Sequence, residues 1–374
     1  MNSPHAPRPG LPVSRRQFLG HLSAGAALLA AGSRVRGEEP PPKKLGVALV
    51  GLGSYATGQL GPALKRTKYC RLAGVVTGSP EKGRKWAQNF GFPETNIYNY
   101  DTMARLADNP DIDIVYVVTP NSLHAEHCIA AARAGKHVIS EKPFTTTVAE
   151  AEHVLAVFRE MNIRHSIGYR LHFDPYHQEL MRLVKTGEFG PFMKTKGDFS
   201  FTMNSRPWRA MRKFAGGGPL MDVGVYVIQE GCMAAGDVAP VAVTAKEGPK
   251  ARPDIFQDVE EDIAWTMEFP NGSTCEGHCS YQQNKNWFRA DAAKGWYEIS
   301  PAYSYNGLAA ATSKGPLHFP GGFSQQAAQM DDFARAILDH RPSPVPGEMG
   351  LRDMKIIAAI YEAAATGKRV TIAA

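Results

Sequence analysis

The chain has 374 residues, of which 43% are hydrophobic and 21% are charged, a composition typical of a folded globular protein rather than a disordered or fibrous one. Its net charge of +6 does not indicate nucleic-acid binding, because residues 1–37 contain five arginines and no acid, and the remaining basic residues nearly balance the acidic ones. Five cysteines without paired Cys or His spacing exclude a disulfide framework and predict no metal site. The length predicts two domains.

The start of the chain is typical of an export signal. Ser14-Arg15-Arg16-Gln17-Phe18-Leu19 precedes a weakly apolar, Ala- and Gly-rich stretch from Leu22 to Ala31, which resembles a twin-arginine signal and is too short to be a convincing membrane span. We predict a signal peptide over 1–37, a short arm over 38–44, and a periplasmic or otherwise exported protein with no other membrane contact; an uncleaved anchor is the alternative. Because this route carries proteins that fold before export, a bound dinucleotide is expected to be held tightly and recycled in place.

A dinucleotide-binding turn opens the mature chain. An apolar run of strand length ends at Val50 and leads into Gly51-Leu52-Gly53-Ser54-Tyr55-Ala56 and a helical segment. In this G-x-G-x-x-A pattern Gly51 allows the turn, Gly53 lets the backbone approach a pyrophosphate, and Ala56 permits close packing of helix on strand.

The second predicted strand, Arg71 to Thr77, indicates which dinucleotide is bound. NAD-specific sites usually have an Asp or Glu at the end of this strand for the ribose 2′-hydroxyl, and no acid follows here. Thr77 and Ser79 offer hydroxyls, and Lys82 with two further bases offers positive charge that suits a 2′-phosphate. We therefore predict NADP rather than NAD.

Two more strands are predicted from Ile112 to Val118 and from Lys136 to Ser140. They lead into Thr119–His124 and Glu141–Pro143. Because ligands of a doubly wound sheet gather at the carboxyl ends of its strands, these segments and the glycine turn should line one cleft.

These motifs resemble those of the Gfo/Idh/MocA oxidoreductases. The resemblance rests on G-L-G-x-Y-A at 51–56, T-P-N-S-L-H-A-E at 119–126 and A-G-K-H-V-x-x-E-K-P at 134–143. The segments I-G-Y-R-L-H-F-D-P at 167–175 and G-G-G-P-L-M-D-V-G-V-Y at 216–226 are similar to the glucose–fructose oxidoreductase group within that family. The resemblance extends from about residue 45 to the C-terminus.

The resemblance implies an α/β Rossmann domain over 45–165, followed by an α+β domain over 166–374 with a large open, mostly antiparallel sheet. One face of that sheet would meet the nicotinamide, the other would form an interface in a homo-oligomer (a dimer or a tetramer), and the C-terminal helices would return to the first domain. Strand-like alternation in the second half fits this fold. The predicted strands are 192–201, 241–246, 261–269, 273–281 and 296–299, and the predicted helices are 324–339 and 351–365.

Three residues carry the predicted chemistry. Asp222 and Tyr226 are spaced to share one helix face, and Lys142 follows a parallel strand into the same cleft. Lowering a tyrosine pKa from about 10 to about 7 takes roughly 4 kcal/mol, which an ammonium in a dry site can supply. We predict Tyr226 as the general acid/base and Lys142 as its electrostatic partner and ligand of the substrate oxygen, with Asp222 binding a second hydroxyl or orienting Lys142; Lys142 as the base remains open.

The predicted site is completed by residues from the motifs. The cofactor-binding residues are predicted to be Gly51, Gly53, Ser54, Tyr55, Ala56, Thr77, Lys82, Thr119, Pro120, Asn121, His124, Glu141, Lys142 and Arg170. The substrate-binding residues are predicted to be Lys142, Tyr169, Arg209, Asp222 and Tyr226. For His124, Arg170 and His172, the sequence leaves open whether the side chain contacts a ligand or supports the cleft. His127 is expected to be structural.

The function predicted from these observations is an exported sugar oxidoreductase. It would transfer hydride between C1 of an aldose and a retained NADP, with a second sugar as acceptor. Three alternatives stay open: a sugar or cyclitol dehydrogenase with exchangeable NAD(P), an NAD-dependent glycoside hydrolase, and a non-catalytic sugar-binding protein.

Overall fold

The structure, a computed structural model, describes residues 43–372 of the chain. The predicted export signal at 1–37 and most of the predicted arm at 38–44 lie outside these residues. Within the described range no helix is both long and apolar enough to span a membrane. The same range holds no cluster of three or more His, Cys, Asp or Glu side chains that could bind a metal.

The first half of the described chain forms a six-stranded parallel sheet. Its strands are β1 (Leu45–Val50), β2 (Cys70–Val76), β3 (Ile97–Tyr98), β4 (Ile114–Val117), β5 (His137–Ser140) and β6 (His165–Ile167). They lie in the order β3-β2-β1-β4-β5-β6, which is the Rossmann arrangement. The order reverses between β1 and β4, so the ligand crevice is expected at the carboxyl ends of those two strands. The sheet ends two residues beyond the boundary predicted at 165.

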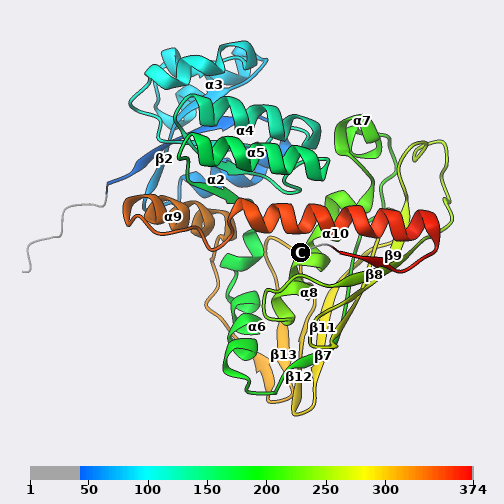
Figure 1. Cartoon of the computed structure of the whole chain (residues 1–374). Coiled ribbons are helices and arrows are strands. Elements are labelled where there is room, and N and C mark those ends of the chain that lie inside the picture. Colours follow the sequence, from blue (N-terminus) through cyan, green and yellow to red (C-terminus); the bar gives the residue numbers. More distant parts are fainter. Residues whose placement is uncertain (1–42, 373–374) are drawn as a thin grey trace, which may run out of the picture. The chain divides into compact units, whose positions relative to one another are not determined.

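Helices cover both faces of this sheet (Figure 1). They are η1 (Ala56–Leu60), α2 (Gly61–Leu64), α3 (Pro80–Phe90), η3 (Tyr100–Asp108), α4 (His124–Arg133) and α5 (Val148–Glu160). Alternate residues of β1 enter two separate cores: Ala48 and Val50 pack on the side of α4 and α5, and Val47 and Leu49 on the side of η1 and α2. Because both faces are covered, every residue of β1 is buried.

The second half forms a nine-stranded sheet in the order β14-β13-β12-β11-β7-β10-β9-β8-β15. Its strands are β7 (Phe192–Ser200), β8 (Ala242–Glu247), β9 (Asp262–Glu268), β10 (Thr274–Ser280), β11 (Lys285–Ala292), β12 (Gly295–Ile299), β13 (Ala310–Thr312), β14 (Gly315–Leu317) and β15 (Val370–Thr371). Only β7 and β10 pair in parallel, so the predicted mostly antiparallel sheet is confirmed. Four of these strands were not predicted: β11, which is rich in charged residues, and β13, β14 and β15, which are only two or three residues long.

A fully buried helix lies between this sheet and the other helices. It is α8 (Val225–Ala234), and it contacts β7, β10 and β11 on one side and the helices α6 (Pro175–Thr186) and α10 (Gly347–Thr366) on the other. In Figure 1, α10 runs along the top of the sheet, between β8 and α5. This layering places the start of α8, which carries Tyr226, at the junction of the two sheets.

The penultimate helix, α9 (Gln325–Leu338), packs against the Rossmann sheet. Met330 and Phe333 enter the core that contains Leu60 and Leu49. The last segment therefore returns to the first domain, in the manner that the resemblance implies.

Candidate active site

A cavity of about 1030 Å³ opens at the carboxyl ends of β1, β4 and β5 and faces the second sheet. All the predicted cofactor-binding residues line it. Of the predicted substrate-binding residues, Lys142, Arg209, Asp222 and Tyr226 line it and Tyr169 does not. The structure thus brings the two predicted sets together in one site.

The glycine turn has the shape that a dinucleotide requires. Gly51 has a φ of +99°, and a Cβ there would lie 3.0 Å from the carbonyl oxygen of Val118. A Cβ at Gly53 would meet nothing within 4 Å, so open space lies in front of the backbone. Ala56 is buried at the start of η1, where free N–H groups can meet an anion. These residues fit the pyrophosphate of a nicotinamide dinucleotide.

The end of β2 presents hydroxyls and a cation to the cavity. The Thr77 hydroxyl accepts from the Ser79 backbone N–H at 3.1 Å, and the Ser79 hydroxyl caps α3 by accepting from the Lys82 N–H. Lys82 is exposed and lines the cavity. The nearby acid, Glu81, does not line the cavity and is paired with Lys85 at 2.8 Å.

Glu141 is a buried carboxylate at the end of β5. Its Oε1 accepts from the Tyr116 hydroxyl at 2.7 Å, and its Oε2 accepts from the Lys142 backbone N–H at 3.3 Å. Burial raises the pKa of Glu141, and the Tyr116 hydrogen bond and the Lys142 charge oppose the rise.

Lys142 extends from β5 toward the start of α8. Its Nζ donates to the backbone carbonyl of Asp222 at 2.7 Å and lies 4.0 Å from the Asp222 carboxylate. It also lies 4.5 Å from the centre of the Tyr226 ring, over its face. Burial lowers the pKa of the Lys142 ammonium, while Asp222 and Glu141 act in the opposite direction.

The Asp222 carboxylate is held from two sides. One oxygen accepts from Arg209 Nε at 3.2 Å and the other from the Tyr281 hydroxyl at 3.0 Å. The residue lies in the π-helical turn η7 (Leu220–Gly224), which runs directly into α8. The predicted convergence of Lys142 and Asp222 is present, and Tyr281 is a partner that the sequence analysis missed.

A buried glutamate fixes the start of this turn. Glu260 Oε2 accepts from the Gly218 N–H at 2.9 Å, and Oε1 accepts from the Leu220 N–H at 3.1 Å and from the Tyr361 hydroxyl at 2.9 Å. Glu260 thus supplies acceptors for donors that the first turn of a helix leaves free.

The Tyr226 hydroxyl has a different partner from the one predicted. It accepts from Arg170 Nε at 3.1 Å, whereas Lys142 lies over the ring because its ammonium is bound to the carbonyl of Asp222. Burial raises the pKa of Tyr226, and the Arg170 guanidinium counteracts part of the rise. The prediction that Lys142 lowers this pKa toward neutrality was therefore wrong for the structure.

Tyr169 does not belong to the cavity. Its side chain is buried in the main core. Burial is the main cause that raises the pKa of the Tyr169 hydroxyl, and the Asp353 carboxylate raises this pKa further. The next residue, Arg170, points into the cavity, and adjacent residues of the turn face opposite ways. The prediction of Tyr169 as a substrate ligand was wrong.

Of the histidines near the cleft, His124 lines the cavity, whereas His127 and His172 lie behind its wall. His124 contacts the carbonyls of Pro143 and Thr119 through its two ring nitrogens, and burial lowers its pKa to about 4. His127 is stacked on Tyr100. The Nε2 atom of His172 contacts the Gln229 amide oxygen away from the cavity.

Aromatic and amide side chains complete the cavity, and the sequence analysis did not name them. They are Tyr100, Phe199, Phe201, Trp208, Asn286, Tyr303, Ser304, Tyr305 and Asn306. The alternation of Phe199 and Phe201 at the end of β7 was a usable signal. Trp208 adds a further ring to the cavity wall, and the Arg209 guanidinium lies over this ring, 4.3 Å from its centre.

The fold and the cavity together define the class of dinucleotide-dependent dehydrogenases with a separate substrate domain. Residues 45–169 match the oxidoreductase family with an NAD-binding Rossmann fold, GFO/IDH/MocA, and residues 177–299 match the GFO/IDH/MocA C-terminal domain. The chain belongs to the Gfo/Idh/MocA family and is an NAD(P)-dependent oxidoreductase.

Several known proteins are similar to the chain. The crystal structure of aldose-aldose oxidoreductase from Caulobacter crescentus, complexed with glycerol, is 40% identical, with a TM-score of 0.85 over 88% of this chain and 100% of that one. The D-xylose 1-dehydrogenase [NADP(+)] of Haloarcula marismortui is 27% identical over 343 residues, 87% of this chain and 92% of that protein. A levoglucosan dehydrogenase in complex with NADH and levoglucosan shares the fold, at 22% identity and a TM-score of 0.76 over 89% of this chain and 100% of that one.

Proposed function

We propose that the protein is an exported sugar oxidoreductase that oxidises an aldose at C1 to the lactone, retains NADP, and reduces a second sugar. The observation that carries the proposal is the convergence of Lys142, Asp222 and Tyr226 where the dinucleotide crevice meets a cavity wall of aromatic and amide side chains. Such walls suit sugars, because ring C–H faces pack on aromatics while hydroxyls bond to amides. The 40% identity to an aldose-aldose oxidoreductase favours the same substrate class.

The residues of the chain divide the work on the C1 hydroxyl. A bound nicotinamide supplies the acceptor for the hydride that leaves C1, and the hydroxyl proton must go to a side chain. Burial lowers the pKa of Lys142 and raises that of Tyr226, so both directions favour Lys142 as the proton acceptor. The Tyr226 oxygen already accepts from Arg170, so its own proton is free to donate toward the substrate oxygen. Asp222 orients Lys142 through its carbonyl.

NADP rather than NAD is proposed from the end of β2. The part of the cavity at the end of β2 is lined by Thr77, Ser79 and the exposed Lys82, and the carboxylates that line the cavity, Glu141 and Asp222, belong to its other parts. The similarity to a dehydrogenase named for NADP(+) supports this choice.

Export and assembly complete the proposal. The twin-arginine pattern at residues 14–19 supports export to the periplasm or beyond. The open face of the nine-stranded sheet, where Trp287 lines a hollow of about 480 Å³, supports a homo-oligomer, a dimer or a tetramer.

The test begins with the purified mature protein. Denaturation should release NADP, identified by its absorbance and by chromatography, and the dialysed protein should convert a mixture of two aldoses to lactone and alditol without added cofactor. Absence of released nicotinamide, together with turnover only when NADP is added, would select a sugar dehydrogenase with exchangeable cofactor. That second candidate is favoured by the similarity to D-xylose 1-dehydrogenase.

A further inference from the structure

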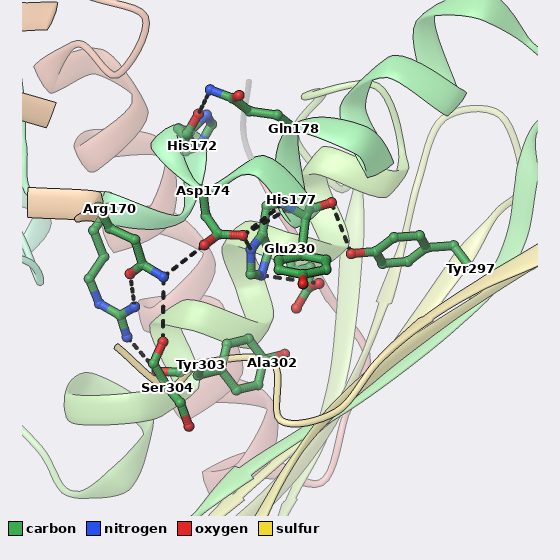
Figure 2. A network of polar contacts seen from close by, with 12 residues as sticks. Arg170, His172, Asp174, His177, Gln178, Glu230, Tyr297, Ala302, Tyr303 and Ser304 are labelled. Atoms are coloured by element: carbon green, nitrogen blue, oxygen red, sulfur yellow. Dashed lines mark hydrogen bonds and ion pairs between the residues drawn. The ribbon is translucent and has the colours of Figure 1, made fainter. Parts of the chain in front are cut away.

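Arg170 contacts the Tyr226 hydroxyl and begins a line of buried polar side chains. Figure 2 shows this line, which passes Asp174 and His177 and reaches Glu230. Its Nε donates to the Tyr226 oxygen at 3.1 Å, its Nη1 donates to Gln325 Oε1, and its Nη2 donates to the carbonyl of Tyr303 at 2.6 Å. The side chain is almost completely buried and also lies between the Tyr226 ring and the Tyr305 ring. Its position is therefore set by the acceptors around it.

Gln325, at the start of α9, can hold only one orientation. Its Nε2 donates to Asp174 Oδ2 at 3.0 Å and to the Ser304 carbonyl at 3.4 Å, which leaves Oε1 to accept from Arg170. A carboxylate needs the NH2 group and a guanidinium needs the carbonyl oxygen, so a flipped amide would lose both contacts. Asp174 therefore fixes the orientation of the Gln325 amide, and the amide oxygen in turn holds Arg170.

Asp174 is in turn fixed by the first turn of α6. Its Oδ1 accepts from the Tyr176 N–H at 2.9 Å and lies 3.2 Å from His177 Nδ1. Burial alone would raise the pKa of Asp174, but the hydrogen bonds from His177 and Gln325 bring it below its ordinary value. The carboxylate is therefore held ionised.

The line ends at Glu230 on α8, beneath the cavity. Its Oε1 lies 3.5 Å from His177 Nε2, and both side chains are fully buried. Among the described residues, neither Glu230 oxygen, nor His177 Nε2, nor the Tyr303 hydroxyl has a hydrogen-bond partner. Burial raises the pKa of Glu230 to about 7, so the carboxyl is only partly ionised near neutral pH. The titratable groups around Glu230 are His177, Asp174, Tyr303, Tyr297 and Cys275.

We propose that Gln325, Asp174, His177 and Glu230 form a positioning network that holds the Arg170 guanidinium on the Tyr226 hydroxyl and so sets the acidity of that hydroxyl. The proposal rests on the proposed function for the part that Tyr226 plays at the substrate. The four residues of the network do not line the cavity, and they reach it only through Arg170. They therefore influence Tyr226 by holding the Arg170 guanidinium in place.

The consequence for Tyr226 follows from its surroundings. The groups that act on the hydroxyl or lie against the ring are Arg170, Glu141, Lys142, Asp222, Tyr55 and Tyr305. Arg170 is the one that donates a hydrogen bond to the hydroxyl oxygen and favours the phenolate. If Gln325 no longer holds Arg170, that donor is free to turn toward other acceptors, and the pKa of Tyr226 rises.

The experiment measures the Tyr226 hydroxyl directly. The protein is labelled with 3-fluorotyrosine, whose phenol is more acidic than that of tyrosine, and the Tyr226 resonance is assigned by its loss in Tyr226→Phe. Gln325→Met removes the amide and keeps the length of the side chain, and Gln325→Glu keeps an oxygen for Arg170 but loses the NH2 group that donates to Asp174. Gln229→Met is the matched control, because Gln229 is a buried glutamine that contacts His172 and Asp353 and not Arg170.

We expect the ¹⁹F titration of Tyr226 to move up by about one pH unit or more in Gln325→Met, as a lost charged hydrogen bond implies. It should also stay above the wild-type value in Gln325→Glu, because the new carboxylate repels Asp174 and no longer holds the line together, and it should stay unchanged in Gln229→Met. With sugars, kcat should fall about threefold in Gln325→Met at nearly constant KM, less than the loss expected when the Tyr226 hydroxyl is removed. An unchanged Tyr226 titration in folded Gln325→Met, or an equal shift in the control, overturns the network. Wild-type protein that oxidises no sugar, with the shift present, overturns the proposed function and leaves the network standing.

Discussion

A single methyl group at Gly218 should displace the turn that carries Asp222. The Cβ of Gly218→Ala would lie 2.1 Å from the backbone oxygen of Glu260 and 3.0 Å from its Cδ. The backbone oxygen belongs to the segment leading into β9 and cannot rotate away, so the turn or that segment must move by about 1 Å to restore an ordinary contact.

The movement has two costs. Overpacking of this kind typically destabilises a protein by about 1–3 kcal/mol. The displaced turn also strains the hydrogen bonds that the Gly218 and Leu220 N–H groups donate to the Glu260 carboxylate, each worth about 1.5–3 kcal/mol. We expect a loss of about 3 kcal/mol in the free energy of unfolding. Because Asp222 lies four residues further on and orients Lys142, a displacement of about 1 Å should also lower kcat by about 10²-fold.

The assay is urea unfolding followed by circular dichroism, with sugar turnover measured on the folded fraction. Gly58→Ala is the matched control, because Gly58 is exposed in η1 and a Cβ there would meet nothing within 4 Å. The control should gain up to about 1 kcal/mol from helix propensity and keep its activity. Wild-type stability and kcat in Gly218→Ala would refute the claim that this contact positions Asp222.

Three further outcomes are expected. Lys142→Met should lower kcat by about 10²–10⁴-fold, because the buried proton acceptor is lost, whereas Tyr226→Phe should lower it only about tenfold; stopped-flow reduction of the cofactor measures both, and the reverse order would make Tyr226 the base. Lys82→Ala should weaken NADP binding about fivefold and leave NAD binding unchanged in calorimetric titrations, and equal losses for both would count against a 2′-phosphate contact. His278 is hydrogen-bonded to Asp198 and Asp262, which raise its pKa from 6.5 to about 9. This shift contributes about 1–3 kcal/mol to the free energy of unfolding, a contribution that is fully present below pH 6.5 and is lost as the pH rises through 9. Urea unfolding at pH 6 and at pH 9.5 should show this loss of stability, and His278→Asn should abolish it. An equal loss in the variant would show that His278 is not its cause.

Local sequence was sufficient for the cofactor crevice. Gly51 and Thr77 each follow directly after a buried strand, and the carboxyl ends of parallel strands meet at one edge of the sheet, so their convergence could be predicted from the order of the strands. The short strands β13, β14 and β15 could not be predicted in this way, because two or three residues are too few to show a periodic pattern.

The sequence by itself determined the Rossmann order, the mostly antiparallel second sheet and the set of charged groups at their junction. Only the tertiary structure decided which group meets which. Arg170 rather than Lys142 reaches the Tyr226 hydroxyl, Tyr169 turns into the core, and Gln325 arrives from the far end of the chain. Such pairings depend on side-chain direction and on contacts between residues 56 to 155 positions apart, which no local pattern encodes.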